Sequence, residues 1–405
     1  MNEVRAARHR GRACTIGILA ALALGSACAR PRALSPPSAS GSDLHFDPAR
    51  LDSVTAYLRT EAGSGTFPGA VIAVGHHGRL VLLAAVGRYG IDDPRPVEPG
   101  TTYDLASLTK VVGLTTAVEL LVQEGKLELD VPVNRYVPAF AGPGKDRVTI
   151  RLLLTHASGL PAWRPLYVET TTREGAMALV DTTPLVAEPG RVTVYSDLGA
   201  IVVTQAVEAV TGETIDQFLD RRLFAPLGMR STRFLPPYDW RDRIAPTERS
   251  VDGTIIRGTV HDENTWRLGG VSGHAGLFST AGDLAKFAAW LLDQWAGRQV
   301  PAGDPVPTLP SDLVRGWTRR QNLAPGSSRA LGWNTPANGN SAGSKLSSLA
   351  FGHTGFTGTS MWLDPEKDLF IILLTNRVHP SRANTQIRRV RPRIANLVVD
   401  ALTRP

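Results

Sequence analysis

Hydrophobic positions near the N-terminal end of the chain change from a helical period to a strand period. Leu51, Val54 and Leu58 recur at helical spacing behind Asp47 and Pro48, which predicts a helix that begins at one of these two residues. The segment GAVIAVGHHGRLVLLAAVG follows, with two apolar, β-rich runs that flank a His-His-Gly sequence. Such a pattern is typical of a β-hairpin.

Strand character returns near the C-terminus, after a mainly helical middle. The segment from Ser107 to about Gly125 has a helical pattern, and further helices are expected around 198–210 and 280–295. SMWLDPEKDLFIILLTN then contains two apolar runs around a polar turn, and a last helix is expected from about Asn384 to Ala401. We therefore predict an α/β (α+β) fold, in which both ends of the chain build one antiparallel sheet and a mainly helical lobe is inserted.

The first 45 residues differ in composition from the rest. Residues 1–27 contain an Arg-rich stretch, an apolar run and small residues, a pattern typical of a signal peptide. The apolar run is too short to span a bilayer. Cys28 follows where a lipoprotein carries its lipid, although Gly25 departs from the usual motif. Ordinary cleavage is the alternative. Residues 28–45 are a predicted flexible linker and 46–405 a catalytic domain, so we expect an exported, periplasmic or cell-envelope protein, with a lipid anchor as its only membrane contact.

Composition narrows the possible partners and cofactors. The chain has 405 residues, 42% hydrophobic and 20% charged, with a formal net charge of +7. No basic tract is interleaved with aromatic residues, so a nucleic-acid partner is not expected. The only cysteines, Cys14 and Cys28, lie in the leader region, which excludes a disulfide framework or thiolate metal site in the domain. No metal or cofactor is predicted.

One short motif predicts nucleophilic chemistry. Ser107-Leu108-Thr109-Lys110 places a hydroxyl and an amine three residues apart, on one face of a helix. A neutral lysine, made so by burial and nearby cations, could remove the proton from Ser107. The alternative is an exposed lysine on an ordinary helix, because S-x-x-K also arises by chance.

Two further motifs, in this order, change the interpretation. Tyr195-Ser196-Asp197 and His353-Thr354-Gly355 follow the S-x-x-K sequence. With LLLTHASGLP, GGVSGHAGLFSTAGDLAKFA and FGHTGFTGTSMWLDPEKDLFIILLTN, the chain resembles the serine β-lactamase and DD-peptidase (penicillin-binding protein-like) superfamily, in its class C-like branch. The resemblance covers about residues 46–400 and implies the β-lactamase/transpeptidase-like fold.

The resemblance also implies the role of each matching residue. Ser107 would be acylated, while Lys110 and Tyr195 would move the proton to the leaving group and then activate water. The oxyanion hole would consist of the backbone N–H groups of Ser107 and Phe356. Thr354 and Gly355 would dock the substrate along the edge strand, and no cofactor would be needed.

Two positions depart from the penicillin-hydrolysing pattern. Asp197 stands where Asn is usual, and His353 stands where β-lactamases have Lys. Because imidazole is mostly neutral near neutral pH, we expect poor recognition of a substrate carboxylate, no efficient β-lactamase activity, and a substrate without a carboxylate beside the scissile bond. A nearby cation or amide could compensate, but the candidates more simply end a strand and solvate a loop: Asn376, Arg377 and Arg382.

The remaining polar clusters are weaker candidates. His156 and Ser158 are interpreted as a structured turn, and His274 as a possible cleft residue. His261, Asp262 and Glu263 are expected to form a polar loop, since adjacent residues rarely converge on one metal ion. The leading hypothesis is acyl-enzyme hydrolysis of a cell-wall muropeptide or D-amino-acid peptide. A small carboxylic ester as substrate, and a non-catalytic wall-binding or sensor domain, remain as alternatives.

Overall fold

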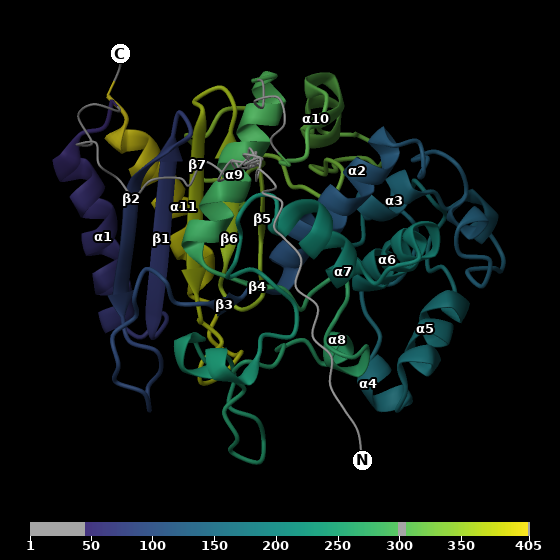
Figure 1. The fold of residues 1–405 in the computed structure, drawn as a ribbon, viewed down its shortest axis with the longest axis horizontal. Helices are drawn as coiled ribbons and strands as arrows, with labels where there is room; N and C mark the ends of the chain where they lie inside the picture. The colour runs from purple at the N-terminus through teal and green to yellow at the C-terminus, as the bar shows by residue number, and fades with distance from the viewer. Residues whose placement is uncertain (1–44, 299–304, 404–405) are drawn as a thin grey trace, which may run out of the picture. The chain divides into compact units, whose positions relative to one another are not determined.

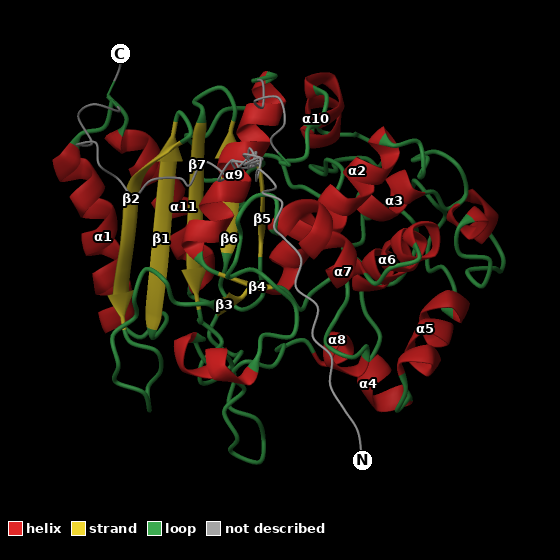
Figure 2. Cartoon of the chain, in the orientation of Figure 1, coloured by secondary structure: helices red, strands yellow, loops and turns green. Residues whose placement is uncertain are grey.

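The structure is a computed structural model that describes residues 45–298 and 305–403. The predicted signal peptide, Cys28 and the linker except His45 lie outside the described residues. Its centre is a five-stranded antiparallel sheet in the order β2-β1-β7-β6-β5 (Figures 1 and 2). The strands are β1 Gly69–His76, β2 Arg79–Gly87, β5 Phe351–Thr354, β6 Ser360–Asp364 and β7 Leu369–Thr375.

Pairing between β1 and β7 joins the two ends of the domain. Ala70 lies opposite Thr375 and His76 opposite Leu369. The predicted hairpin is confirmed, since β1 and β2 turn through His77 and Gly78, both with positive φ. The sheet from both chain ends is therefore confirmed.

Both faces of the sheet are covered, so the two sides of β1 belong to different cores. Ala70, Ile72 and Val74 pack with α1 (Pro48–Gly63) and α11 (Ile387–Ala401). The alternate residues Val71 and Ala73 belong to the larger core, to which α9 (Ala281–Ala296) contributes. This two-residue alternation follows from strand geometry.

The caps of these helices follow from the sequence. Asp47 caps α1 by accepting hydrogen bonds from Ala49 N and Arg50 N, as the predicted start requires. Thr280 caps α9 in the same way, through Asp283 N. The last helix begins at Ile387, three residues later than predicted, because Asn384 instead binds the Gly65 and Thr66 carbonyl oxygens.

The helical lobe lies beside the β5 edge of the sheet (Figure 1). The predicted helix from Ser107 starts as a 3₁₀ turn at Ala106–Leu108, continues as a π-helix over Lys110–Thr115, and becomes α2. The other elements of the middle region are β3 Tyr103–Asp104, α2 Thr116–Gln123, α3 Ile150–Leu154, α4 Leu166–Glu169, α5 Arg173–Thr182, α6 Asp197–Thr211, α7 Ile215–Leu219, α8 Glu263–Arg267, β4 Phe278–Ser279 and α10 Ser311–Thr318.

A membrane-spanning helix needs both sufficient length and high mean hydropathy. Within 45–298 and 305–403, no single helix meets both conditions. One pair bent by 71°, α6 with the segment Ile215–Phe224, meets them in combination.

Candidate active site

Ser107 lies in a strained turn at the start of the first helix of the lobe. The preceding residue, Ala106, has φ +46°, a conformation that L-residues adopt rarely. Asp104 stabilises this turn, because its Oδ1 accepts a hydrogen bond of 2.8 Å from Ala106 N. The turn directs the Ser107 hydroxyl to Lys110 Nζ, at 3.1 Å. The predicted Ser–Lys pair is therefore formed in the structure.

Lys110 is buried, and polar groups surround its ammonium. Nζ donates to the backbone oxygen of His274 at 2.9 Å and lies 2.6 Å from Asp197 Oδ1. Burial by itself lowers the pKa of Lys110, but the attraction of Asp197 and Tyr195 outweighs it and raises this pKa above its ordinary value. The expectation of a neutral lysine is therefore wrong for the free protein, because the nearest charge is a carboxylate and not a cation.

Tyr195 and Asp197 are positioned by the start of α6. Ser196 caps this helix, since its hydroxyl accepts a hydrogen bond from Gly199 N and donates to Pro161 O. The same cap brings the Asp197 carboxylate to Lys110 and the Tyr195 ring to 5.0 Å from Lys110 Nζ. The Tyr195 hydroxyl is buried and has no hydrogen-bond partner within the part of the chain that the structure describes.

His156 supports this arrangement from behind. It forms the predicted turn, with φ +58°, and its Nδ1 accepts a hydrogen bond from Ser196 N at 3.1 Å. Its ring lies 4.5 Å from the Tyr195 ring, centroid to centroid. Burial, together with the positive charges of Arg329 and Lys110, lowers the pKa of His156 well below its ordinary value. His156 is thus a neutral support for the tyrosine.

The end of β5 packs directly against the nucleophile turn. A Cβ atom on Gly355 would lie 2.3 Å from Leu105 O, so only glycine fits this contact. Thr357 and Thr359 donate hydrogen bonds to the backbone oxygens of Asp104 and Leu105, at 2.7 and 2.9 Å. The predicted docking residues Thr354 and Gly355, and the exposed Phe356 after them, therefore lie beside Ser107.

His353 presents a hydrogen-bond acceptor to the site. Its Nδ1 is 2.8 Å from Thr354 O, which can only accept, so the proton is assigned to Nδ1 and Nε2 is left with a lone pair. Nε2 is buried without a hydrogen-bond partner among the described residues. Burial and the charges of Arg329 and Lys110 lower the pKa of His353 well below its ordinary value. The expectation of a neutral imidazole here agrees with the structure.

Arg329 is a site residue that the sequence reasoning missed. Its guanidinium carbon lies 5.0 Å from the centroid of the Tyr195 ring, and its charge lowers the pKa of His353. A cation that the sequence analysis did not consider therefore lies near Tyr195 and His353, on the loop before β5. The sequence gives only a weak signal, an arginine directly before the buried residues Ala330 and Leu331.

The weaker candidates are mainly structural. His274 reaches the site through its backbone oxygen, while its ring bonds Ser272 and pairs with Asp262 at 2.9 Å. Asp262 caps α8, as suits a polar loop. Within the described ranges, no cluster of His, Cys, Asp and Glu could hold a metal ion.

The three compensating candidates after β7 all have structural partners. Asn376 donates to the backbone oxygens of Tyr89 and Pro246, and Arg377 donates to that of Phe356. Arg382 pairs with two glutamates, Glu248 and Glu263. They therefore end a strand and fix a loop, as the simpler interpretation expects.

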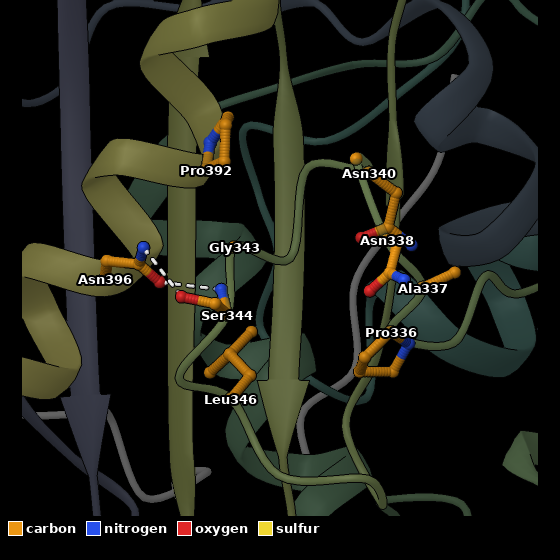
Figure 3. Close-up of a pocket in the computed structure, with 10 residues that line it drawn as sticks. Pro336, Ala337, Asn338, Asn340, Gly343, Ser344, Leu346, Pro392 and Asn396 are labelled. Carbon is orange, nitrogen blue, oxygen red and sulfur yellow. Dashed lines mark hydrogen bonds between the residues drawn. The ribbon is translucent and has the colours of Figure 1, made fainter.

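A larger hollow lies away from these residues, between the 336–346 loop and α11 (Figure 3). It has a volume of about 520 Å³, and its lining includes Asn338, Asn340, Ser344 and Asn396 but no titratable side chain. The Asn396 side chain accepts a hydrogen bond from Ser344 N and so connects the loop to the helix. Because no titratable side chain lines this hollow that could activate Ser344, it is not the catalytic site.

The fold and the Ser–Lys–Asp arrangement define a class of serine hydrolase, and the comparisons with known proteins give the family. The Beta-lactamase family model matches residues 54–393, so the chain belongs to the β-lactamase family. It is a serine hydrolase with the β-lactamase/transpeptidase-like fold.

Two curated relatives cover most of the chain. An N-acetylmuramyl-L-alanine amidase of Bacillus subtilis (strain 168) is 31% identical over 390 residues, 85% of this chain and 85% of the relative. A putative D-alanyl-D-alanine carboxypeptidase of Salmonella typhi is 30% identical over 391 residues, 86% of this chain and 88% of the relative.

Solved structures show the same fold at lower identity. The octameric penicillin-binding protein homologue from Pyrococcus abyssi has a TM-score of 0.69 and 21% identity, covering 86% of this chain and 77% of that one. EstCE1, a hydrolase with promiscuous acyltransferase activity, has a TM-score of 0.67 and 22% identity, covering 85% and 99%.

Proposed function

We propose that this protein is an exported serine hydrolase that cleaves an amide bond of a cell-wall muropeptide or D-amino-acid peptide through an acyl-enzyme on Ser107. The observation that carries the proposal is the continuous contact from Ser107 Oγ through Lys110 Nζ to Asp197 Oδ1, at 3.1 and 2.6 Å. The curated relatives named as a muramyl-alanine amidase and a putative D-alanyl-D-alanine carboxypeptidase support this substrate class.

The contact predicts a path for the serine proton. As Ser107 Oγ attacks the substrate carbonyl carbon, its proton passes to Lys110 Nζ, while Lys110 passes a proton to Asp197 Oδ1. Exclusion of water by the substrate favours this transfer, because an ion pair loses more stabilisation than a neutral pair when it is desolvated. Without the transfer to Asp197, the raised pKa of Lys110 would leave no lone pair to accept the serine proton.

Collapse of the tetrahedral intermediate needs a proton on the leaving nitrogen. The Tyr195 hydroxyl supplies it and is reprotonated by Lys110, which lies against the tyrosine ring. Water then attacks the acyl-enzyme and gives a proton to Tyr195, which passes one to Lys110. As Ser107 leaves, Lys110 returns a proton to its oxygen, and Asp197 returns its proton to Lys110. The backbone N–H groups of Ser107 and Phe356 are the proposed donors to the oxyanion, in agreement with the packing of Gly355 on Leu105 O.

Export is part of the proposal and rests on the pattern of residues 1–27, with Cys28 as the proposed lipid site. Fractionation of cells that express the full chain tests it. The wild type is expected in the envelope fraction, and a Cys28→Ser variant is expected to lose incorporation of labelled fatty acid. A wild type that stays in the cytoplasm would contradict the export proposal without affecting the catalytic one.

Covalent labelling and muropeptide digestion test the catalytic proposal. The purified protein is expected to gain one fluorophosphonate adduct by intact mass spectrometry and to release a peptide or amino acid from isolated muropeptides. A Ser107→Ala variant is expected to lose both properties, whereas Ser53→Ala, at an exposed serine of α1, keeps them. A wild type that is neither labelled nor active would favour a non-catalytic binding domain. A wild type that is labelled and hydrolyses an ester, but does not hydrolyse muropeptides, would favour a carboxylesterase.

A further inference from the structure

Arg391, in the second turn of α11, donates hydrogen bonds to the turn between β5 and β6. Its Nη2 lies 2.7 Å from the Gly355 backbone oxygen and 2.8 Å from that of Thr359, so one nitrogen holds both ends of this turn. Gly355 N also donates to Thr359 O, at 2.8 Å. The turn is therefore fixed by its own backbone and, from α11, by a guanidinium.

The charge of Arg391 has backbone oxygens and no carboxylate as partners in the ranges 45–298 and 305–403. Its Nε is shielded from solvent and has no hydrogen-bond partner in the same ranges. Burial, and then repulsion by Arg377 and Arg388, lowers the pKa of Arg391 to about 9. A partly buried cation without a carboxylate partner raises the free energy of the folded state, so an arginine is not the side chain that packing alone would favour here.

The Gly355 oxygen belongs to the same peptide unit as the Phe356 N–H, which is the second proposed donor to the oxyanion. A hydrogen bond to the carbonyl oxygen of a peptide polarises its N–H group and strengthens the hydrogen bond that this N–H donates. Because the peptide unit is planar, a bond that fixes its oxygen also fixes the direction of its N–H. Arg391 therefore acts on both the direction and the strength of the Phe356 donor.

The other side-chain donors to this turn do not reach the Gly355 oxygen. Arg377 Nε donates to the next oxygen along the chain, that of Phe356, at 2.8 Å. Besides Arg391, the described residues supply the Gly355 oxygen only with a longer hydrogen bond of 3.2 Å, from Gly358 N. Within that part of the chain, Arg391 is therefore the charged donor to the peptide that carries the Phe356 N–H.

We propose that Arg391 is a positioning residue for acyl transfer, which orients and polarises the Gly355–Phe356 peptide so that the Phe356 N–H stabilises the oxyanion. This inference rests on the proposed function and adds to it a residue that acts through the backbone and not on the substrate. The contribution grows as negative charge develops on the substrate carbonyl oxygen, so it accelerates acylation without strengthening ground-state binding. It differs from the role of Lys110, because no proton moves through Arg391.

Two esters that differ in one atom test this role. In p-nitrophenyl butyrate the negative charge develops on oxygen, and in p-nitrophenyl thionobutyrate it develops on sulfur, which is a weaker hydrogen-bond acceptor. Removal of one oxyanion donor costs about 10²- to 10³-fold in rate, so weakening one in Arg391→Met is expected to lower kcat/KM for the oxygen ester by about 10-fold. kcat/KM for the thionoester is expected to fall by less than about 3-fold, so the ratio of the two values decreases.

A transition-state mimic gives a second measurement that does not depend on turnover. The Ser107 oxygen adds to the carbonyl carbon of 1,1,1-trifluoroheptan-2-one while the serine proton passes to Lys110, and the hemiketal oxygen carries the negative charge. The inhibition constant of this ketone is expected to rise in Arg391→Met by about the same factor as kcat/KM for the oxygen ester falls. If the wild type does not hydrolyse the thionoester, this constant decides between the outcomes.

Control variants separate this role from packing. Arg393→Met removes a charge from an exposed position of the same helix and is expected to change neither the ester ratio nor the inhibition constant. Arg391→Lys keeps a cation that donates hydrogen bonds and is expected to recover part of the ratio. If Arg391 only packs α11 on the sheet, kcat/KM per Ser107 that takes a fluorophosphonate adduct would fall equally for both esters or not at all. Either result would overturn the proposal, whatever the change in the free energy of unfolding.

The two proposals fail in different ways. A wild type that hydrolyses neither ester and takes no fluorophosphonate adduct would overturn the proposed acyl-enzyme mechanism and this inference with it. A wild type that is labelled at Ser107 and hydrolyses p-nitrophenyl butyrate, with an ester ratio and an inhibition constant that Arg391→Met leaves unchanged, would overturn only the role of Arg391.

Discussion

Two cations lie 5.0 Å from the centroid of the Tyr195 ring, and only one of them, Lys110, is paired with a carboxylate among the described residues. Lys110, on the nucleophile helix, contacts Asp197, Ser107 and the His274 backbone oxygen. Arg329, on the loop before β5, has no such partner among the described residues. Burial disfavours the charge of both, but only Lys110 has a carboxylate that reverses the effect on its pKa.

The difference separates a cation that is already paired within the protein from one that has no carboxylate partner among the described residues. Lys110 is paired within the protein, since Asp197 Oδ1 lies 2.6 Å from its Nζ, and this pair is part of the proposed proton path. Arg329 is partly buried, and a cation that is partly removed from water without a partner raises the free energy of the folded state. Substitutions that remove one of these charges test the difference between the paired and the unpaired cation.

The largest effect is expected from Lys110→Met, which removes the proposed proton acceptor and keeps most of the side-chain volume. The rate of fluorophosphonate acylation at pH 7 should fall by about 10²- to 10⁴-fold, the usual contribution of a positioned general base. Lys126→Met removes an exposed lysine paired with Glu124 and should leave the rate unchanged. A similar rate in both variants would exclude Lys110 from the proton path.

A smaller loss of rate and a loss of stability are expected from Asp197→Asn, which leaves Lys110 without its carboxylate. Because asparagine cannot accept a proton, the rate of acylation at pH 7 should fall by about 10- to 100-fold. Removal of one partner of a buried pair costs about 3–5 kcal/mol, and we expect about 1–3 kcal/mol here since Asp197 is partly exposed.

The pH dependence of this stability loss has a definite sign. In the wild type the pKa of Lys110 is raised, so its contribution to stability is complete below the unfolded pKa of about 10.4 and is lost above it. The difference in unfolding free energy between wild type and Asp197→Asn should therefore keep its full size from neutral pH up to about pH 10 and decrease only at higher pH. Chemical denaturation at several pH values measures it. A difference that grows with pH would show that Asp197 stabilises the fold by another contact.

The sequence predicted the secondary structure around the site better than the pairing of the charges within it. The period of apolar residues was sufficient for the two β-hairpins, because each strand and its turn are local in the chain. The S-x-x-K spacing likewise placed Lys110 beside Ser107. The pairing of Lys110 with Asp197 and the approach of Arg329 depend on how segments more than eighty residues apart pack together, and no local pattern records that packing.

Arg329→Gln is expected to stabilise the free protein, in contrast to Asp197→Asn. Replacement of an unpaired, partly buried charge by a neutral side chain removes a desolvation penalty, and we expect a gain of about 0.5–2 kcal/mol in the free energy of unfolding. Arg319→Gln, at an exposed site, should change it by less than about 0.5 kcal/mol. A clear loss of stability in Arg329→Gln would mean that its contact with Tyr195 outweighs the penalty, and the contrast with Lys110 would then be wrong.

The smallest effect concerns acid sensitivity. The pKa values of His156 and His353 are lowered by burial first and by Arg329 second, so both histidines are neutral in the folded protein near pH 6. Since an unfolded histidine binds a proton near pH 6.5 and these two do not, the folded state loses stability as the pH falls below about 6.5. Without the charge at position 329, both pKa values rise toward the unfolded value and this loss becomes smaller. Unfolding free energies at pH 7 and pH 5 should therefore differ less in Arg329→Gln than in the wild type, by about 1 kcal/mol, and an equal difference would show that burial alone keeps the two histidines neutral.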